Sequence, residues 1–164
     1  MKAIVVYYSL EGNTKFVAKL LAKELQADLL ELKPIKEYPK GKISKFIWGG
    51  KAATFAETPQ LEDYKFQMEE YDLILIGTPV WNNRIAPPLN TFLSKHEIEN
   101  KKVALFASST GGKAERTFEK LSTKASKVVA TLSLIEAAKN QADTKEKVDA
   151  FISNLKGLFE KGES

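Results

Sequence analysis

The segment YYSLEGNTKFVAKLLAKEL, residues 7–25, passes from the end of an apolar run into a helical pattern within a few residues. The turn between the two holds the small or polar residues Ser9, Gly12, Asn13 and Thr14. A glycine suits a tight turn, and an Asn or Thr side chain caps the start of a helix. The same corner also suits an anion, because the first N–H groups of a helix lack partners and the helix dipole is positive there. The residues alone leave both interpretations open.

Outward from this corner, apolar runs with β-strand character alternate with segments of helical spacing. The runs expected to form strands are residues 3–8, 29–32, 73–76, 103–107 and 128–132. The segments expected to form helices are residues 16–25, 89–93, 114–121 and 148–159. Four of the strand runs are nearly continuous, as in strands that are buried on both faces. We therefore predict an α/β protein with a doubly wound parallel sheet and helices on both faces.

Length and composition favour one domain, residues 1–164, in a reducing compartment. The chain has 164 residues and no Cys, which excludes disulfides, thiolate metal sites and a catalytic thiol. Its apolar runs are too short for a signal peptide or a membrane span, so we expect a soluble, cytoplasmic protein without membrane contact. Lys and Arg number 25 against 21 acidic residues, a net charge of +4. This mild excess argues against nucleic-acid binding and favours an acidic partner or an anionic cofactor.

Three loops are candidates for a ligand site. In an open α/β sheet, ligands lie beyond the carboxyl ends of the strands, where the strand order reverses. The loops that follow the first, third and fourth strand runs are residues 9–14, 77–88 and 107–112, and all are rich in Gly, Ser, Thr, Asn or Pro. The loops at the opposite ends hold mostly Lys, Glu and Asp. The contrast predicts a site at one edge of the sheet.

Several other α/β sites are excluded by the residues in these loops. A phosphoacceptor receiver needs carboxylates after the first and third strands, where Tyr8 and Thr78 stand. A nucleotide-hydrolase P-loop needs Ser or Thr after its Gly-Lys pair, where Ala114 follows Gly112 and Lys113, and a dinucleotide fingerprint needs three glycines where only Gly12 is present. The single His96 lies in a charged stretch, which is more typical of a solvated histidine than of a metal ligand. We predict no metal site.

The first loop, Ser9-Leu10-Glu11-Gly12-Asn13-Thr14, resembles the [ST]-x-T-G-x-T pattern with which flavodoxin-like FMN-binding proteins wrap the FMN phosphate. The resemblance extends from the first strand to the last helix, and it implies FMN as cofactor and the strand order 2-1-3-4-5. Glu11 departs from the pattern. Because a carboxylate repels a phosphate dianion, we expect Glu11 to turn outward and to offer only its backbone N–H. Ser9, Asn13 and Thr14 would then donate the side-chain hydrogen bonds.

The resemblance also implies roles for the second and third loops. The residues implied to bind the cofactor are Ser9, Leu10, Glu11, Gly12, Asn13, Thr14, Thr78, Pro79, Val80, Trp81, Asn82, Asn83, Ser108, Ser109, Thr110, Gly111 and Gly112. Trp81 would stack on the flavin ring. In the alternative interpretation, Trp81 is a core or interface residue without contact to a flavin. Asn82 and Asn83 would offer backbone and amide groups to the ring. The third loop has no aromatic residue, so the other flavin face would be open or covered by Tyr38, Trp48 or Phe55 from the long connection 34–70.

Two functional classes share this cofactor. In the first, the protein is an electron shuttle that uses the FMN semiquinone and hydroquinone states, and redox partner proteins dock transiently at the flavin edge. In the second, it is an NAD(P)H- or quinone-dependent FMN oxidoreductase with a small substrate. The net positive charge of the chain and the absence of an aromatic residue from the third loop favour the oxidoreductase. The short length of the chain favours the shuttle. We expect the shuttle, without catalytic residues; a flavin-free interaction module of the same fold is a further alternative.

Overall fold

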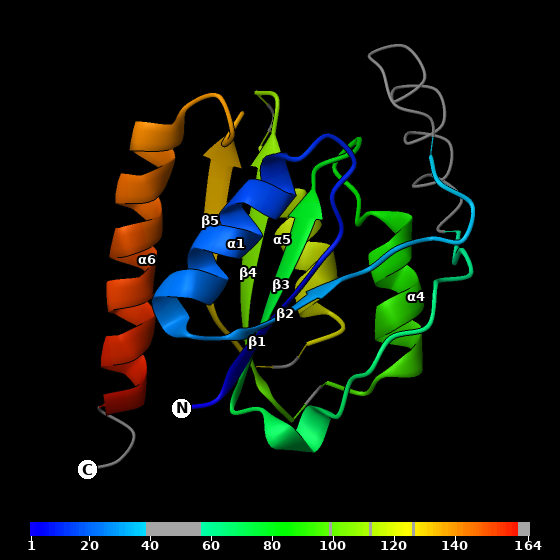
Figure 1. The fold of residues 1–164 in the computed structure, drawn as a ribbon, viewed down its shortest axis with the longest axis horizontal. Coiled ribbons are helices and arrows are strands. Elements are labelled where there is room, and N and C mark those ends of the chain that lie inside the picture. The colour runs from blue at the N-terminus through cyan, green and yellow to red at the C-terminus, as the bar shows by residue number, and fades with distance from the viewer. Residues whose placement is uncertain (39–56, 99, 112, 126, 161–164) are drawn as a thin grey trace.

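The strands expected from the apolar runs form one five-stranded sheet in the computed structural model, which describes residues 1–38, 57–98, 100–111, 113–125 and 127–160 (Figure 1). They are β1 (Ala3–Tyr7), β2 (Asp28–Glu31), β3 (Leu73–Pro79), β4 (Lys102–Ser109) and β5 (Lys127–Ile135). Their order is β2-β1-β3-β4-β5, and every neighbouring pair is parallel. This confirms the predicted fold class and strand order. Gly112, Trp48 and Phe55 lie outside the described residues.

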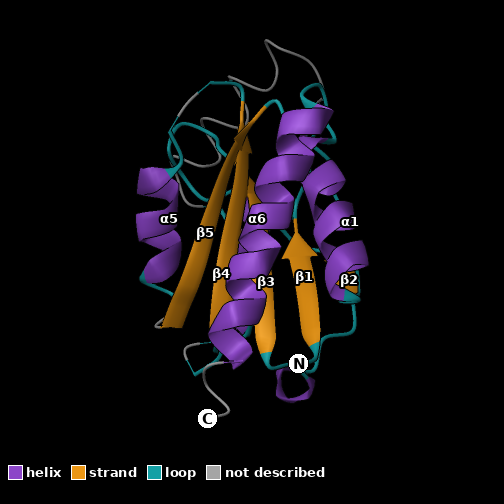
Figure 2. Cartoon of the chain, turned by 90° about the vertical axis from the view of Figure 1, so that its left-hand side faces the viewer, coloured by secondary structure: helices purple, strands orange, loops and turns teal. Residues whose placement is uncertain are grey.

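Helices cover both faces of the sheet. They are α1 (Asn13–Leu25), α4 (Pro87–Lys95), α5 (Glu115–Ser122) and α6 (Gln141–Glu160), with a 3-10 turn η2 (Met68–Glu70) below β3. Figure 2 shows α1 and α6 in front of the strands, and Figure 1 shows α4 on the opposite face. Across the described residues, every helix is too short or too polar to pass through a bilayer.

Strand β1 is apolar at every position because both of its faces are buried. Val5 and Tyr7 pack in the core beneath α1 and α6, while Ile4 and Val6 pack in the core beneath α4 and α5. Because consecutive side chains point to opposite faces, a strand buried on both faces needs an apolar residue at each position. A strand at the edge of the sheet is less completely buried, and Leu29 of the edge strand β2 is 42% exposed.

Strands β3 and β4 are longer than the apolar runs indicated. Pairing continues through Thr78 with Ala107 and Pro79 with Ser108, and β4 ends at Ser109. The sequence argument placed these residues in loops because Thr, Pro and Ser are typical of turns. They extend the strands instead, because the ladder between two central strands satisfies their backbone groups. The extension carries polar side chains to the carboxyl edge of the sheet.

Gly77 lies where β3 and β4 leave no room for a side chain. A Cβ atom built on Gly77 would lie 2.1 Å from Cζ of Phe106, which is fully buried in the α1–α6 core. The Phe106 ring therefore occupies the space that any larger residue at position 77 would need.

Candidate functional site

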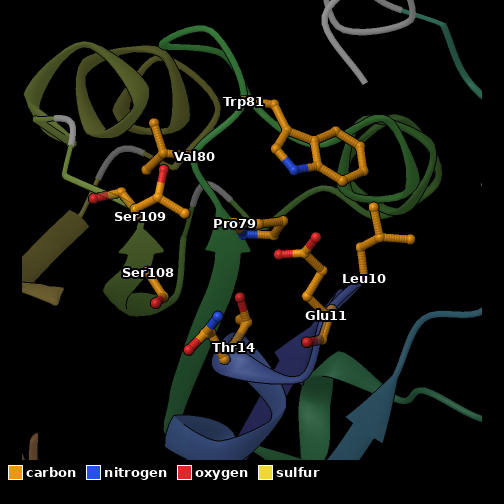
Figure 3. A pocket seen from close by; sticks show the side chains of 11 residues that line it. Leu10, Glu11, Thr14, Pro79, Val80, Trp81, Ser108 and Ser109 are labelled. Atoms are coloured by element: carbon orange, nitrogen blue, oxygen red, sulfur yellow. The ribbon is translucent and has the colours of Figure 1, made fainter. Parts of the chain in front are cut away.

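A cavity lies at the carboxyl edge of β1, β3 and β4, where the sequence predicted a site (Figure 3). Its lining residues are Ser9, Leu10, Glu11, Asn13, Thr14, Pro79, Val80, Trp81, Ser108, Ser109 and Thr110. Every one belongs to the predicted set. The other predicted residues do not line it: Gly12, Thr78, Asn82, Asn83 and Gly111 lie elsewhere, and Gly112 is not described. The structure thus brings together residues from three loops that are far apart in the sequence.

The first turn of α1 forms one wall of the cavity. Gly12 is the N-cap residue, with φ of 95°, and it makes no side-chain cap hydrogen bond. Of the two interpretations left open, the structure does not show an Asn or Thr cap: Gly12 holds the N-cap position in a left-handed conformation, and Asn13 and Thr14 lie within the helix. The Gly12 N–H donates to Ser9 Oγ at 3.2 Å. The Ser9 hydroxyl therefore supports the loop as well as lining the cavity.

Asn13 links the start of α1 to the loop after β5. Its Oδ1 accepts a hydrogen bond from the Ala138 N–H at 2.9 Å, across 125 positions of sequence. Asn13 could bind an anion in the cavity only through its Nδ2 group, because Oδ1 is a hydrogen-bond acceptor and repels an anion. The loop after β5 was not among the candidate loops, and nothing local in the sequence indicates such a distant contact.

Two hydroxyl groups in the cavity wall lack hydrogen-bond partners among the described residues. They are Thr14 Oγ1 on α1 and Ser108 Oγ on β4, and the two residues are 1% and 4% exposed. A buried hydroxyl without a partner costs about 1–3 kcal/mol, so such groups are rare unless a ligand or water satisfies them. Figure 3 shows both on the side of Pro79 away from Trp81. Both hydroxyls are thus available to form hydrogen bonds with polar atoms of a ligand.

Trp81 provides an apolar wall at the other side of the cavity. It is 4% exposed, and its indole packs edge to face against Tyr8 at 5.6 Å and Tyr38 at 5.7 Å between ring centroids. The structure buries Trp81 among aromatic residues and places it in the cavity wall, and its stacking on a flavin stays a prediction. Tyr38, a candidate cover for the flavin, packs against Trp81 and Tyr8 instead of lining this cavity.

Asn82 and Asn83 form a tight turn rather than part of the cavity. Their φ angles are 50° and 56°, and the Arg84 N–H donates to Trp81 O at 3.0 Å. Two consecutive residues of positive φ define a type I′ turn, for which Asn is suited. The Asn-Asn pair was the sequence signal for this turn. The two residues do not line the cavity, and their contact with the flavin stays a prediction; the turn directly follows Trp81 and fixes the backbone there.

The Thr78 hydroxyl also forms hydrogen bonds within the protein instead of lining the cavity. It donates to Pro79 O at 2.9 Å and accepts from the Ala86 N–H at 3.4 Å. These bonds join the end of β3 to the residue before α4. Gly111, in turn, has φ of 143°, a conformation that favours glycine in the loop after β4.

Glu11 lines the cavity with its side chain. It is exposed, as expected, but Figure 3 shows its carboxylate extending toward Pro79 rather than away from the cavity. The expectation that only its backbone faces the ligand is therefore wrong.

The phenols beside the cavity are uncharged at neutral pH. Burial raises the pKa of Tyr38 to about 12, and the nearby Glu57 adds to the shift. Burial also raises the pKa of Tyr8, with smaller contributions from Tyr38 and Glu37. Among the described residues, no three His, Asp or Glu side chains gather as metal ligands would.

Comparison with known proteins identifies the family. A family model described as flavodoxin matches residues 2–155 of this chain. The chain belongs to the flavodoxin family. Among curated relatives of this flavodoxin, the flavodoxin-like domain-containing protein BilS of Clostridioides difficile (strain CD3) is 30% identical over 125 residues. The match covers 74% of this chain and 56% of BilS, so the chain spans little more than half the length of that relative.

Solved structures of similar fold include two flavoproteins. A putative flavoprotein from Bacteroides uniformis ATCC 8492 has a TM-score of 0.74 and 25% identity, over 93% of this flavodoxin and 97% of that chain. A flavoprotein in complex with FMN from Lactobacillus acidophilus NCFM has a TM-score of 0.71 and 23% identity, over 86% and 97%. At such identity, the second likeness establishes the fold.

Proposed function

We propose that this flavodoxin binds FMN in the cavity of Figure 3 and carries electrons between partner proteins. The observation that carries the proposal concerns two buried hydroxyls, Thr14 Oγ1 and Ser108 Oγ, which have no partner within the described part of the chain. Both line the same cavity as the N-terminus of α1. The similar flavoprotein from Lactobacillus acidophilus was solved with FMN. Chemistry and resemblance thus favour the same ligand.

The donor set fits the two ends of FMN. The phosphate would accept hydrogen bonds from the first N–H groups of α1 and from the Thr14 hydroxyl, beside the positive end of the helix dipole. The ring would lie against the apolar side chains of Val80 and Trp81. Ser108 and its strand neighbours would hold polar ring atoms. Bound FMN supplies one- and two-electron redox chemistry, and the protein supplies binding, orientation and electrostatics.

An electron carrier fits the cavity better than an enzyme that needs acid–base groups. Among its described lining residues, Glu11 is the one ionisable side chain. Electron transfer needs no catalytic side chain, only a cofactor edge within reach of a partner. Redox partner proteins would dock transiently near this edge.

The alternative, an oxidoreductase acting on a nicotinamide or quinone, also needs no catalytic acid or base. Its support is the loop after β4, where Thr110 and Gly111 leave no aromatic side chain to cover a flavin face. A small hydride donor could then approach the ring from that side.

One experiment tests binding and separates the two classes. Purified protein is titrated with FMN, and quenching of flavin fluorescence gives the affinity. The loaded protein is then mixed anaerobically with NADH, NADPH or dithionite, and the flavin absorbance is followed. Slow or absent bleaching by the nicotinamides with stepwise reduction by dithionite supports the carrier, whereas rapid bleaching by a nicotinamide supports the oxidoreductase. Lack of FMN binding overturns both.

A further inference from the structure

The loop after β5, residues 136–140, contacts two walls of the proposed FMN cavity from outside. None of its residues is among the described residues that line the cavity. The Ala138 N–H donates to Asn13 Oδ1 at 2.9 Å. The Glu136 N–H donates to Ser109 O at 2.8 Å. Asn13 and Ser109 both line the cavity, the first from the start of α1 and the second from the end of β4, so the loop joins walls that are far apart in the sequence.

Further hydrogen bonds hold this loop in place. Thr144 Oγ1, in the first turn of α6, donates to Ala137 O at 3.0 Å. Asn140 Nδ2 donates to Ile135 O at 3.0 Å, and the Asn140 N–H donates to Glu136 O at 3.1 Å. Thr144 is buried, and α6 packs against α1 (Figure 2). A loop fixed by its own turn, by β5 and by α6 can hold the orientation of a side chain that it contacts.

The contact with Ala138 decides which end of the Asn13 carboxamide a ligand can use. The carboxamide has an acceptor, Oδ1, and a donor, Nδ2, and half a turn about its last rotatable bond exchanges the two. A backbone N–H is itself a donor, so it can pair only with Oδ1. The end left for a ligand is then Nδ2. The contact thus selects the orientation in which Asn13 can donate to an anion.

We propose that Ala138 is a positioning residue for the phosphate of FMN, and that its N–H keeps the Asn13 carboxamide turned with the donor end available to the ligand. The inference rests on the proposed FMN site, in which the start of α1 holds the phosphate. Without the contact, the half-buried Asn13 side chain would take both orientations, and one of them offers an acceptor to the dianion. FMN would then have to select one orientation on binding, which lowers its affinity.

The contact should matter more for FMN than for riboflavin. Riboflavin lacks the phosphate, and so it lacks the group to which Asn13 would donate. A hydrogen bond to a charged acceptor is also stronger than one between neutral groups. We therefore expect loss of the Ala138 N–H to lower the affinity for FMN about three- to tenfold and to leave that for riboflavin almost unchanged.

The test removes the N–H of Ala138 and keeps its methyl group. Cell-free synthesis with L-lactic acid at position 138 replaces the backbone amide by an ester, which has no donor there. The matched control is the same exchange at Ala150, in the interior of α6 and outside the described cavity lining. Quenching of flavin fluorescence gives the dissociation constants of FMN and riboflavin. The ratio of FMN to riboflavin affinity should fall about three- to tenfold for the ester at 138 and stay at the wild-type value for the ester at 150.

A second control addresses the carbonyl group of the ester. An ester carbonyl is a weaker acceptor than an amide carbonyl, so the exchange at 138 also weakens the bond from Thr144 to Ala137 O. Thr144→Val removes that bond and keeps the Ala138 N–H. We expect Thr144→Val to lower the ratio of affinities clearly less than the ester at 138 does.

An independent measurement reports the contact itself. Hydrogen exchange of the Ala138 amide is followed by nuclear magnetic resonance in wild type, Asn13→Asp and Asn13→Ala. Asp keeps an oxygen acceptor for this N–H, so exchange should stay slow, whereas Ala removes the acceptor and should speed exchange about fivefold. Asn13→Asp should nevertheless lose FMN affinity, because a carboxylate oxygen replaces the donor. Its intact contact and weakened binding would separate the positioning role of Ala138 from the donor role of Asn13.

Three results would overturn the inference in a wild type that binds FMN. They are an unchanged ratio for the ester at 138, an equal fall for Thr144→Val, and unchanged exchange of the Ala138 amide in Asn13→Ala. If the ester at 138 does not fold, the exchange measurement decides. If wild type binds neither flavin, the proposed function fails and the inference with it, so the two failures are distinguished.

Discussion

Thr14 presents its hydroxyl at the cavity from the first turn of α1, buried and without a partner among the described residues. Thr117 on α5 has the same property but does not line the cavity, so it is a matched control. We expect Thr14→Val to weaken FMN binding about tenfold through the loss of one charge-assisted hydrogen bond. Thr117→Val should leave the affinity unchanged. Titration of flavin fluorescence measures both, and equal affinities for the two variants would refute the role of Thr14.

Substitutions of Gly77 and Gly157 test the packing and stability of the fold rather than ligand binding. We expect Gly77→Ala to lower the free energy of unfolding by about 1–3 kcal/mol, because its Cβ would meet the Phe106 ring at 2.1 Å. Gly157, in the interior of α6, has open space where a Cβ would lie, with no atom within 4 Å of that point. Gly157→Ala should therefore raise stability by about 0.5–1 kcal/mol, as alanine favours the helix. Urea denaturation monitored by circular dichroism gives both values; a neutral Gly77→Ala would contradict the assigned contact.

At the scale of the elements, the turn after β3 sets the place of Trp81. Asn82 and Asn83 both have positive φ, which a β-branched residue adopts with strain of about 1–3 kcal/mol. We expect Asn83→Val to lower stability by roughly that amount and to weaken FMN binding, since Trp81 would shift. Asn83→Gly, which fits a type I′ turn, should preserve both. Thermal melting and fluorescence titration are the measurements, and a Val variant as stable as the Gly variant would rule out the turn assignment.

The sequence predicted most elements because their signals are local. Continuous apolar runs indicate buried parallel strands, as in β1, and helical spacing indicates α1 and α6. It ended β3 and β4 too early, because Pro79 and Ser108 are turn-forming residues in isolation and become strand residues only through pairing with each other. Local propensity is overridden there by the sheet.

The candidate site was predicted from loop composition and family resemblance, and its errors are errors of side-chain direction. No local pattern specifies that Asn13 Oδ1 bonds Ala138, because the contact joins positions 125 residues apart. The direction of Glu11 was argued from the charge of the ligand, whereas Figure 3 shows its carboxylate extending toward Pro79. The Asn82–Asn83 turn, by contrast, could have been predicted from the residue pair alone.

For the whole molecule, the fold and the cavity are energetically separable. One hydrophobic core lies beneath α1 and α6 and another beneath α4 and α5, and together they bury most of the apolar side chains. The cavity lies at the carboxyl edge of the sheet, where α1, β3 and β4 end or begin. Leu10 and Trp81 belong to both the cavity wall and a core, but most core residues lie away from the cavity, so we expect the sheet to form without a cofactor.

Ligand removal should therefore lower stability without unfolding the protein. A ligand that binds only the folded state stabilises it by RT ln(1 + [L]/Kd), about 2.7 kcal/mol at a concentration of 100 times Kd. We expect the apoprotein to keep its far-ultraviolet circular dichroism, and its melting temperature to rise steadily with the logarithm of FMN concentration. Calorimetric scans of apoprotein with increasing FMN measure this, with adenosine monophosphate as a phosphate-bearing control that lacks the flavin ring. Because the flavin ring would supply the contact with Trp81, the control should stabilise the protein far less. A melting temperature that FMN leaves unchanged, or an apoprotein without a helical circular dichroism signal, would contradict this prediction.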